Sequence, residues 1–181
     1  MEKSINFYQK ILGYDKVLYD AVGAFNDFAV LPGGNKEMRR VLLTHSETRK
    51  GAFSQLLGKT FIELVQVYNK PKRSIYENRL WGDLGFIHLC FDMVGIDSMR
   101  EYCKANGHPF TVDSAQSFDM GEAAGHFSYI EDPDGTLIEF VETHKIPVLK
   151  KIGWYLNLRK RQLDKPLPKW MLRALRFNRV K

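Results

Sequence analysis

The sequence has only two cysteines among its 181 residues, Cys90 and Cys103, and it has no CxxC pair. So few cysteines exclude a disulfide-stapled scaffold and a cysteine zinc ribbon, and they fit a reducing compartment. No run approaches the roughly 18 consecutive apolar residues of a membrane-spanning helix. The first four residues are too polar for a signal peptide. We therefore expect a cytoplasmic protein without a membrane span.

Residues that build a core are plentiful, because 44% of the chain is hydrophobic and 13% aromatic. The net charge of +6 is unevenly distributed. Residues 145–181 contain twelve lysines or arginines and one acid, Asp164, a net charge of +11, whereas residues 1–144 carry 15 basic and 20 acidic side chains, a net charge of −5. Because the body is acidic and has no helix-turn-helix or zinc-finger spacing, we expect no nucleic-acid partner.

Two segments resemble each other and carry a carboxylate at the same place. Residues 60–66 and 136–142 are β-branched and aromatic runs, typical of strands, with Glu63 and Glu139 at their centres. His88 stands in a similar apolar run further along the chain. Burying an unpaired charge is costly unless a cation or a proton partner is present. These three side chains are therefore the first candidates for a functional site.

The similarity extends to a repeated unit of strand, helix and three strands. Short amphipathic helices are expected at residues 4–12 and 97–106, each followed by a glycine suited to a left-handed helix end, with Asp97 and Ser98 as N-caps of the second. An Asp-Pro-Asp-Gly turn at residues 132–135 should join the last two strands as a hairpin. Further strands are expected at residues 16–20, 25–31, 39–44, 85–92, 110–113 and 126–131.

The first copy of the repeat lacks its first strand. His88 lies 19 residues before Gly107, and the position 19 residues before Gly13 falls upstream of residue 1. We therefore expect the natural protein to begin upstream, with a strand that carries a matching His or Gln. The alternative is that any site formed by this chain has three protein ligands, is open, or is inactive. The first copy is longer than the second elsewhere, and its extra residues, around 46–59, are expected to form a loop or an irregular helix.

Together these segments resemble the vicinal oxygen chelate superfamily, which includes glyoxalase I, extradiol dioxygenases, methylmalonyl-CoA epimerase and antibiotic-resistance proteins. Residues 4–14 are similar to the opening helix of the family, residues 85–90 to the strand that presents a metal histidine, and residues 132–139 to the hairpin that presents the last metal carboxylate. The resemblance covers roughly residues 3–143. It implies an α+β fold of paired βαβββ modules that form a curved mixed sheet with a central cleft.

The resemblance also divides the chain. Within the basic extension, residues 148–156 and 170–177 have apolar side chains at helical spacing, so two short helices are expected to pack on the body or on a second subunit. An acidic partner, a membrane surface or an anionic substrate are the alternatives for this extension. The expected domains are a first module without its N-terminal strand (1–69), a linker (70–83), a second module (84–143) and a basic helical C-terminal extension (144–181).

The resemblance implies that His88, Glu63 and Glu139 bind one divalent metal ion, either Ni, Zn, Co, Mn or Fe, and that a fourth ligand lies on the absent strand. Imidazole and carboxylate donors suit such ions. It further implies that Glu139 is the catalytic base, with Glu63 as a static ligand or second base. A small-molecule substrate and a homodimer are the expected partners.

The implied activity is that of a glyoxalase-like lyase or isomerase, related to lactoylglutathione lyase. Such an enzyme moves a proton on an α-hydroxycarbonyl or thioester-adjacent carbon through a metal-held enediolate. One alternative is an extradiol dioxygenase, in which Glu63 would be a surplus carboxylate. The other is a non-catalytic protein that sequesters a drug or ligand. Two further residues have open roles: His126 as a cavity acid or base, or more readily a surface or hairpin-capping residue, and Cys90 as a core thiol.

Overall fold

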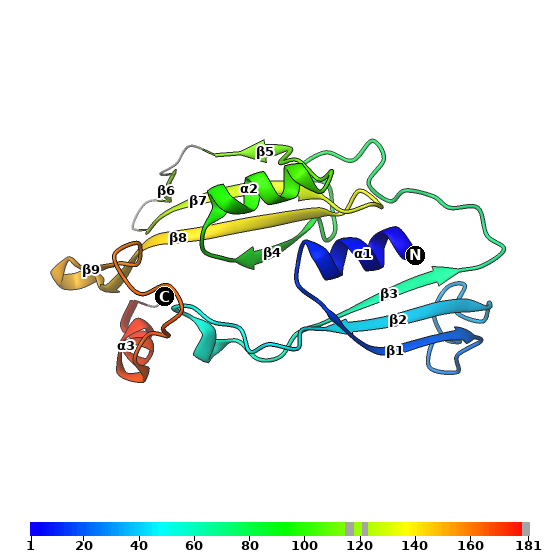
Figure 1. Ribbon diagram of the computed structural model, residues 1–181, viewed down its shortest axis with the longest axis horizontal. Coiled ribbons are helices and arrows are strands. Elements are labelled where there is room, and N and C mark those ends of the chain that lie inside the picture. Colours follow the sequence, from blue (N-terminus) through cyan, green and yellow to red (C-terminus); the bar gives the residue numbers. More distant parts are fainter. Residues whose placement is uncertain (115–117, 121–122, 179–181) are drawn as a thin grey trace. The chain divides into compact units, whose positions relative to one another are not determined.

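The chain divides into two compact units. A computed structural model describes residues 1–114, 118–120 and 123–178 (Figure 1), so the last three residues of the predicted extension lie outside the described part. The first unit consists of Met1–Thr48, Lys59–Asp83 and Pro133–Gly135. The second unit consists of Arg49–Gly58, Leu84–Asp132 and Thr136–Lys181.

The first unit is a helix followed by an antiparallel sheet in the order β1-β2-β3. The helix buries Phe7 and Tyr8. Gly13, which follows the helix, has a φ of +68°, the left-handed conformation that its position predicted. A short 3-10 turn, η1 (Ser54–Leu56), lies in the segment that was expected to be irregular, and this turn belongs to the second unit. The elements of the first unit are α1 (Glu2–Lys10), β1 (Lys16–Gly23), β2 (Met38–Thr44) and β3 (Phe61–Val67).

The prediction of a strand over residues 25–31 is wrong, because this segment forms a series of turns between β1 and β2. Its aromatic residues pack locally. The Arg40 guanidinium lies 4.9 Å from the ring centroid of Phe25 and 4.1 Å from that of Phe28. A cation over an aromatic face is stabilising. The aromatic pattern that suggested a strand therefore reflects contacts with one arginine of β2.

The second unit repeats the arrangement with its first strand present. Strand β4 is parallel to β8, β8 is antiparallel to β7, and the sheet order is β4-β8-β7-β5, with β6 beside β7 and β9 beside β8. The predicted hairpin is confirmed: Gly135 has a φ of +89°, and the Thr136 N–H donates to the Asp132 carboxylate at 2.8 Å. The elements are β4 (His88–Asp92), α2 (Ile96–Ala105), β5 (Val112–Asp113), β6 (Phe118–Met120), β7 (Ala123–Glu131) and β8 (Leu137–Leu149).

The start of α2 differs from the prediction. The helix follows Gly95, whose φ is +84°, and no side chain caps it. Asp97, which was expected to be an N-cap, instead accepts a hydrogen bond from Arg100 at 2.7 Å. The other end is as predicted, because Gly107 has a φ of +82°.

The C-terminal extension starts as a continuation of the sheet. The predicted helix over residues 148–156 is wrong: His144, Ile146 and Val148 alternate as buried residues along β8, which is the period of a strand. Strand β8 is followed by η2 (Lys150–Ile152), β9 (Trp154–Asn157), α3 (Lys169–Ala174) and η3 (Leu175–Asn178), so the second predicted helix is confirmed.

The extension packs onto the second unit through its own small core. Ile146, Leu158 and Leu167 are buried together, and Met171 and Leu172 of α3 pack against them. Ala52 and Phe53, which lie outside the extension, pack against the same cluster. Figure 1 shows β9 and α3 at the C-terminal end of β8. The expectation that the extension docks on the body is therefore confirmed for the described residues.

Candidate functional site

Two of the three predicted ligands lie side by side on neighbouring strands of the second unit. His88 is the first residue of β4, and Glu139 lies on β8, the parallel neighbour of β4. The His88 Nε2 atom is 3.0 Å from Glu139 Oε2. Both side chains are partly buried, with 27% and 16% of their surfaces exposed. An imidazole and a carboxylate therefore meet at a partly buried place on two neighbouring strands.

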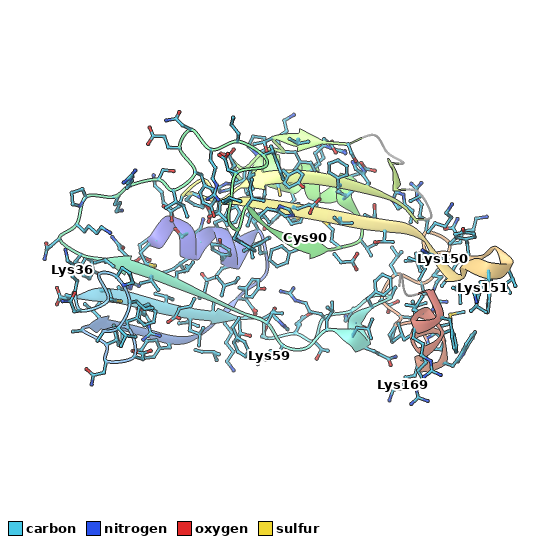
Figure 2. The ribbon with its side chains drawn as sticks, turned by 180° about the vertical axis from the view of Figure 1, so that it is seen from behind. Lys36, Lys59, Cys90, Lys150, Lys151 and Lys169 are labelled. Carbon is cyan, nitrogen blue, oxygen red and sulfur yellow. The ribbon has the colours of Figure 1, made fainter. Side chains whose placement is uncertain are left out.

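Glu139 has a second and a third polar neighbour. In the strand register, Cys90 of β4 and Tyr129 of β7 lie directly opposite Glu139, one on each side. The Cys90 thiol and the Tyr129 hydroxyl both form hydrogen bonds with the Glu139 carboxylate. Cys90 is labelled in Figure 2. The rings of His88 and Tyr129 meet edge to face, with centroids 5.6 Å apart. We call these four residues the Glu139 cluster.

The two hydrogen-bond donors of the Glu139 cluster are held in their protonated forms. Burial, together with the hydrogen bond to Glu139 and its charge, raises the pKa of the Tyr129 hydroxyl well above its ordinary value. The prediction that Cys90 is a core thiol is wrong, because Cys90 is exposed. Desolvation by its neighbours and the charge of Glu139 nevertheless raise the pKa of its thiol to about 12. At neutral pH both groups therefore donate to the carboxylate, and Cys90 is not a thiolate nucleophile.

Glu63 lies on β3 of the first unit and has a different partner. Its Oε1 atom accepts a hydrogen bond from Arg40 Nε at 2.7 Å, and Arg40 also pairs with Asp27 at 2.8 Å. The hydrogen bonds to Glu63 and Asp27 raise the pKa of the Arg40 guanidinium above its usual range. The cation that a carboxylate in an apolar strand requires is thus present next to Glu63. Its role as a metal ligand stays a prediction.

The donor set of the Glu139 cluster fits a divalent metal ion in part. An imidazole nitrogen and a carboxylate oxygen are ligands that Zn²⁺ and similar ions accept. In the part of the chain that the structure describes, no group of three or more His, Cys, Asp or Glu side chains is arranged to hold a metal. His88 and Glu139 would therefore supply two ligands of such an ion, and the remaining positions need other donors.

Tyr129 is a residue of the cluster that the sequence prediction missed. The signal was present in the Asp-Pro-Asp-Gly turn. Counting outward from the turn pairs residue 131 with 137, 130 with 138, and Tyr129 with Glu139, which is the observed register. A hairpin turn in the sequence therefore identifies the residue that lies opposite a candidate carboxylate.

His126 belongs to another group of side chains. It is 3% exposed, and its Nε2 atom is 2.6 Å from Asp113 Oδ1, while the other oxygen of Asp113 accepts from Arg100 Nε at 2.6 Å. The expected surface or hairpin-capping role is therefore wrong. His126 and Tyr129 are three residues apart on β7, so they face opposite sides of the strand. His126 is thus not part of the Glu139 cluster.

The second unit also contains a cavity of about 370 Å³, next to the C-terminal extension. Its wall includes His144 of β8 and Arg161 of the extension. Among the described residues, neither His144 Nδ1 nor Arg161 Nε has a hydrogen-bond partner, although both atoms are buried. Glu142, also in the wall, accepts a hydrogen bond from the Gly95 N–H at 2.7 Å. None of the residues of the Glu139 cluster lines this cavity.

Residues 1–140 match the model of the Glyoxalase/Bleomycin resistance protein/Dioxygenase superfamily. The chain belongs to this superfamily. The match confirms the resemblance that the repeat, the histidine strand and the hairpin indicated. The whole C-terminal extension, residues 144–181, lies beyond the matched residues.

Solved structures of glyoxalase proteins are similar to the chain. A glyoxalase family protein from Bacillus cereus is 17% identical, with a TM-score of 0.55 over 79% of this chain and 86% of that one. A glyoxalase family protein from Enterococcus faecalis is 21% identical, with a TM-score of 0.49 over 78% and 88%. Glyoxalase I from Leishmania major is 19% identical, with a TM-score of 0.45 over 78% of each chain. No curated protein sequence matches the chain. The likeness to the Bacillus cereus protein shows the fold, which is mixed α+β as predicted.

Proposed function

We propose that this member of the glyoxalase superfamily is a lyase or isomerase that moves a proton on an α-hydroxycarbonyl or thioester-adjacent carbon, with Glu139 as the base. The observation that supports this role is the setting of the Glu139 carboxylate. It is mostly shielded from solvent, and it contacts a nitrogen of His88 and the hydroxyl of Tyr129. A base that is positioned by neighbours on both sides is typical of general acid-base catalysis.

Each residue of the Glu139 cluster has its own role in the proposed reaction. Tyr129 and Cys90 donate hydrogen bonds to Glu139 and orient its carboxylate toward a substrate, while the partial burial of the carboxylate limits competition from water. His88 fixes the same carboxylate from the next strand. When bound, a divalent cation held by His88 and Glu139 would stabilise negative charge on the substrate oxygens as a Lewis acid. The proton itself passes to a carboxylate oxygen of Glu139.

The variant Glu139→Gln tests the proposal, because it keeps the shape and one oxygen but removes the base. We expect isomerisation of hemithioacetals, or epimerisation next to a carbonyl or thioester, to fall by roughly 10²- to 10⁴-fold. Glu131→Gln is the matched control, since Glu131 lies on the neighbouring strand β7 and is exposed. Thermal unfolding of each variant verifies the fold. A wild-type rate in Glu139→Gln would refute the assigned base.

A wild-type protein that catalyses neither reaction leads to a different conclusion. If it binds a divalent metal and cleaves a catechol with oxygen, it is a dioxygenase and the proposed proton transfer is wrong. If it binds a ligand with no turnover, the sequestering alternative replaces the enzyme.

A further inference from the structure

The end of the C-terminal extension presents cationic and apolar side chains together. The turn between β8 and β9 carries two lysines, and α3 carries a third; Figure 2 shows all three at this end of the second unit. Large apolar side chains lie next to these lysines in the sequence and remain exposed. We call this surface the hairpin–helix patch and define it by Lys150, Lys151, Ile152, Trp154, Lys169 and Trp170.

The apolar side chains of the patch are not used by the core. Ile152, at the tip of the hairpin, is 73% exposed, and Trp154 and Trp170 are 39% and 56% exposed. The two indole rings stack on each other with centroids 6.2 Å apart, which joins β9 to α3. Helix α3 contributes Met171 and Leu172 to the small core of the extension. Exposed apolar groups that gather in this way mark an interaction surface.

The charge of the extension indicates what the surface attracts. Residues 145–181 carry twelve basic side chains and a single acid, Asp164. The extension therefore has little negative charge of its own to balance the lysines, and its field attracts anions. A partner that fits the patch combines negative charge with a region that accepts indole rings and an isoleucine.

We propose that the hairpin–helix patch docks the protein on an anionic lipid surface. Indole rings favour the boundary between headgroups and acyl chains, and lysines pair with lipid phosphates around them. The exposed isoleucine at the hairpin tip favours lipid over nucleic acid, which offers no comparable apolar layer. None of the described helices is long and apolar enough to cross a membrane. The proposed docking is of the interfacial kind, in which apolar side chains enter the headgroup region.

Vesicle binding by the full chain tests the proposal. We expect co-sedimentation with vesicles of phosphatidylcholine and phosphatidylglycerol, weaker binding at high salt, and little binding to phosphatidylcholine alone. Absence of binding to the phosphatidylglycerol vesicles at low salt would overturn the proposal.

Charge removal at the patch and elsewhere separates a specific surface from general basicity. Because each basic residue at an anionic membrane contributes roughly fivefold in affinity, removing three patch lysines should weaken binding roughly a hundredfold. A control variant removes the same charge from exposed positions of the first unit. An equal loss in both variants would refute the patch as the binding surface. The patch variant is Lys150→Gln, Lys151→Gln, Lys169→Gln, and the control variant is Lys36→Gln, Lys59→Gln, Lys72→Gln.

Tryptophan fluorescence tests whether the indoles enter the lipid. The chain has three tryptophans, and Trp81 lies in the first unit, so Trp81→Phe leaves Trp154 and Trp170 as reporters. We expect a blue shift with phosphatidylglycerol vesicles and none with phosphatidylcholine. Unchanged emission on bound vesicles, or tighter binding to duplex DNA than to the vesicles, would show that the patch is not a lipid-docking surface.

Discussion

Individual charged side chains in the strands are held by partners on adjacent strands. Glu63 of β3 is paired with Arg40 of β2, and Asp113 of β5 meets His126 of β7. Such pairs satisfy groups that would be costly to bury alone. The same rule explains why a carboxylate inside an apolar strand is not by itself a sign of a metal: the arginine next to Glu63 satisfies it in the described structure.

Asp113 offers a test of this rule at the level of one residue. It accepts hydrogen bonds from both His126 and Arg100, each at 2.6 Å. Asp113→Asn weakens both interactions, and His126 is almost completely buried, so we expect the free energy of unfolding at pH 7 to fall by about 1–3 kcal/mol. Asp97→Asn is the control, because Asp97 is an exposed second partner of Arg100 and its loss should change stability little. Equal effects of the two variants would contradict the prediction.

The pH dependence of the Asp113 contribution follows from its pKa. Burial raises the pKa of the Asp113 carboxyl, but the hydrogen bonds from Arg100 and His126 outweigh it, and the net pKa lies below its usual value. A carboxyl with a lowered folded-state pKa stabilises the protein above its unfolded pKa of about 3.9, and this stabilisation is lost as the pH falls through the folded value. Urea unfolding at pH 7 and at acidic pH should therefore show the difference between wild type and Asp113→Asn shrinking in acid.

At the scale of secondary-structure elements, sequence prediction succeeds where a local signal has one physical meaning. The Asp-Pro-Asp-Gly turn determines the β7–β8 hairpin and its register, because proline and glycine fit only certain turn positions. It fails over residues 25–31, where aromatic residues suggest a strand but pack on Arg40 instead. It fails again over residues 148–156, because short apolar runs fit helical and strand periods alike until the partner β9 is known.

The docking of the extension depends on the segment between β9 and α3, which is neither helix nor strand. Leu167 precedes α3, is completely buried with Ile146 and Leu158, and its N–H donates to the Ala52 carbonyl at 2.8 Å. Leu167→Ala removes much of this contact, so we expect a loss of about 2–5 kcal/mol in the free energy of unfolding of the second unit. Leu163→Ala, at an exposed position of the same segment, should have little effect.

Limited proteolysis provides an independent measurement of the same docking. The wild-type chain should resist trypsin between β9 and α3, and Leu167→Ala should be cleaved there much faster. Rapid cleavage of the wild type after Arg159 or Arg161, with no loss of thermal stability, would contradict the packed extension.

At the scale of the whole molecule, the internal repeat made the fold predictable, but it did not identify all the side chains of the site. The first unit has α1 followed by β1, β2 and β3, and the second unit has the corresponding α2 with β5, β7 and β8. The second unit also has β4, which carries His88, and the further strands β6 and β9. The repeat predicted this arrangement because it compares the chain with itself. The family resemblance, rather than the repeat, implied that His88, Glu63 and Glu139 share a site, and the β4–β8 pairing brings two of them, His88 and Glu139, together. Glu63 belongs to the other unit, and the pattern of one strand gives no information about Arg40 on the next.

Metal titration of the full chain tests the complete ligand set. Calorimetric titration with Zn²⁺ or Ni²⁺ should show one site in the wild type. Loss of a residue that only hydrogen-bonds to a metal ligand weakens metal affinity by roughly 10–100-fold. His88→Ala removes a direct ligand, so it should weaken metal affinity by more than this. If Glu63 is a ligand, as the resemblance implies, Glu63→Gln should weaken affinity as well, whereas the exposed control Glu77→Gln should not.

The stability of Glu63→Gln distinguishes a ligand from a partner of Arg40. Loss of the hydrogen bond at 2.7 Å lowers stability in the absence of metal whichever role is correct, so stability alone does not decide. The decisive measurement is the stabilisation that added metal produces, compared between the variant and the wild type. A bound ion stabilises the folded state more when its affinity for that state is higher. We expect this metal-dependent stabilisation to be reduced in Glu63→Gln. If it equals that of the wild type, Glu63 is only the partner of Arg40, and the metal site consists of His88, Glu139 and donors outside this pair.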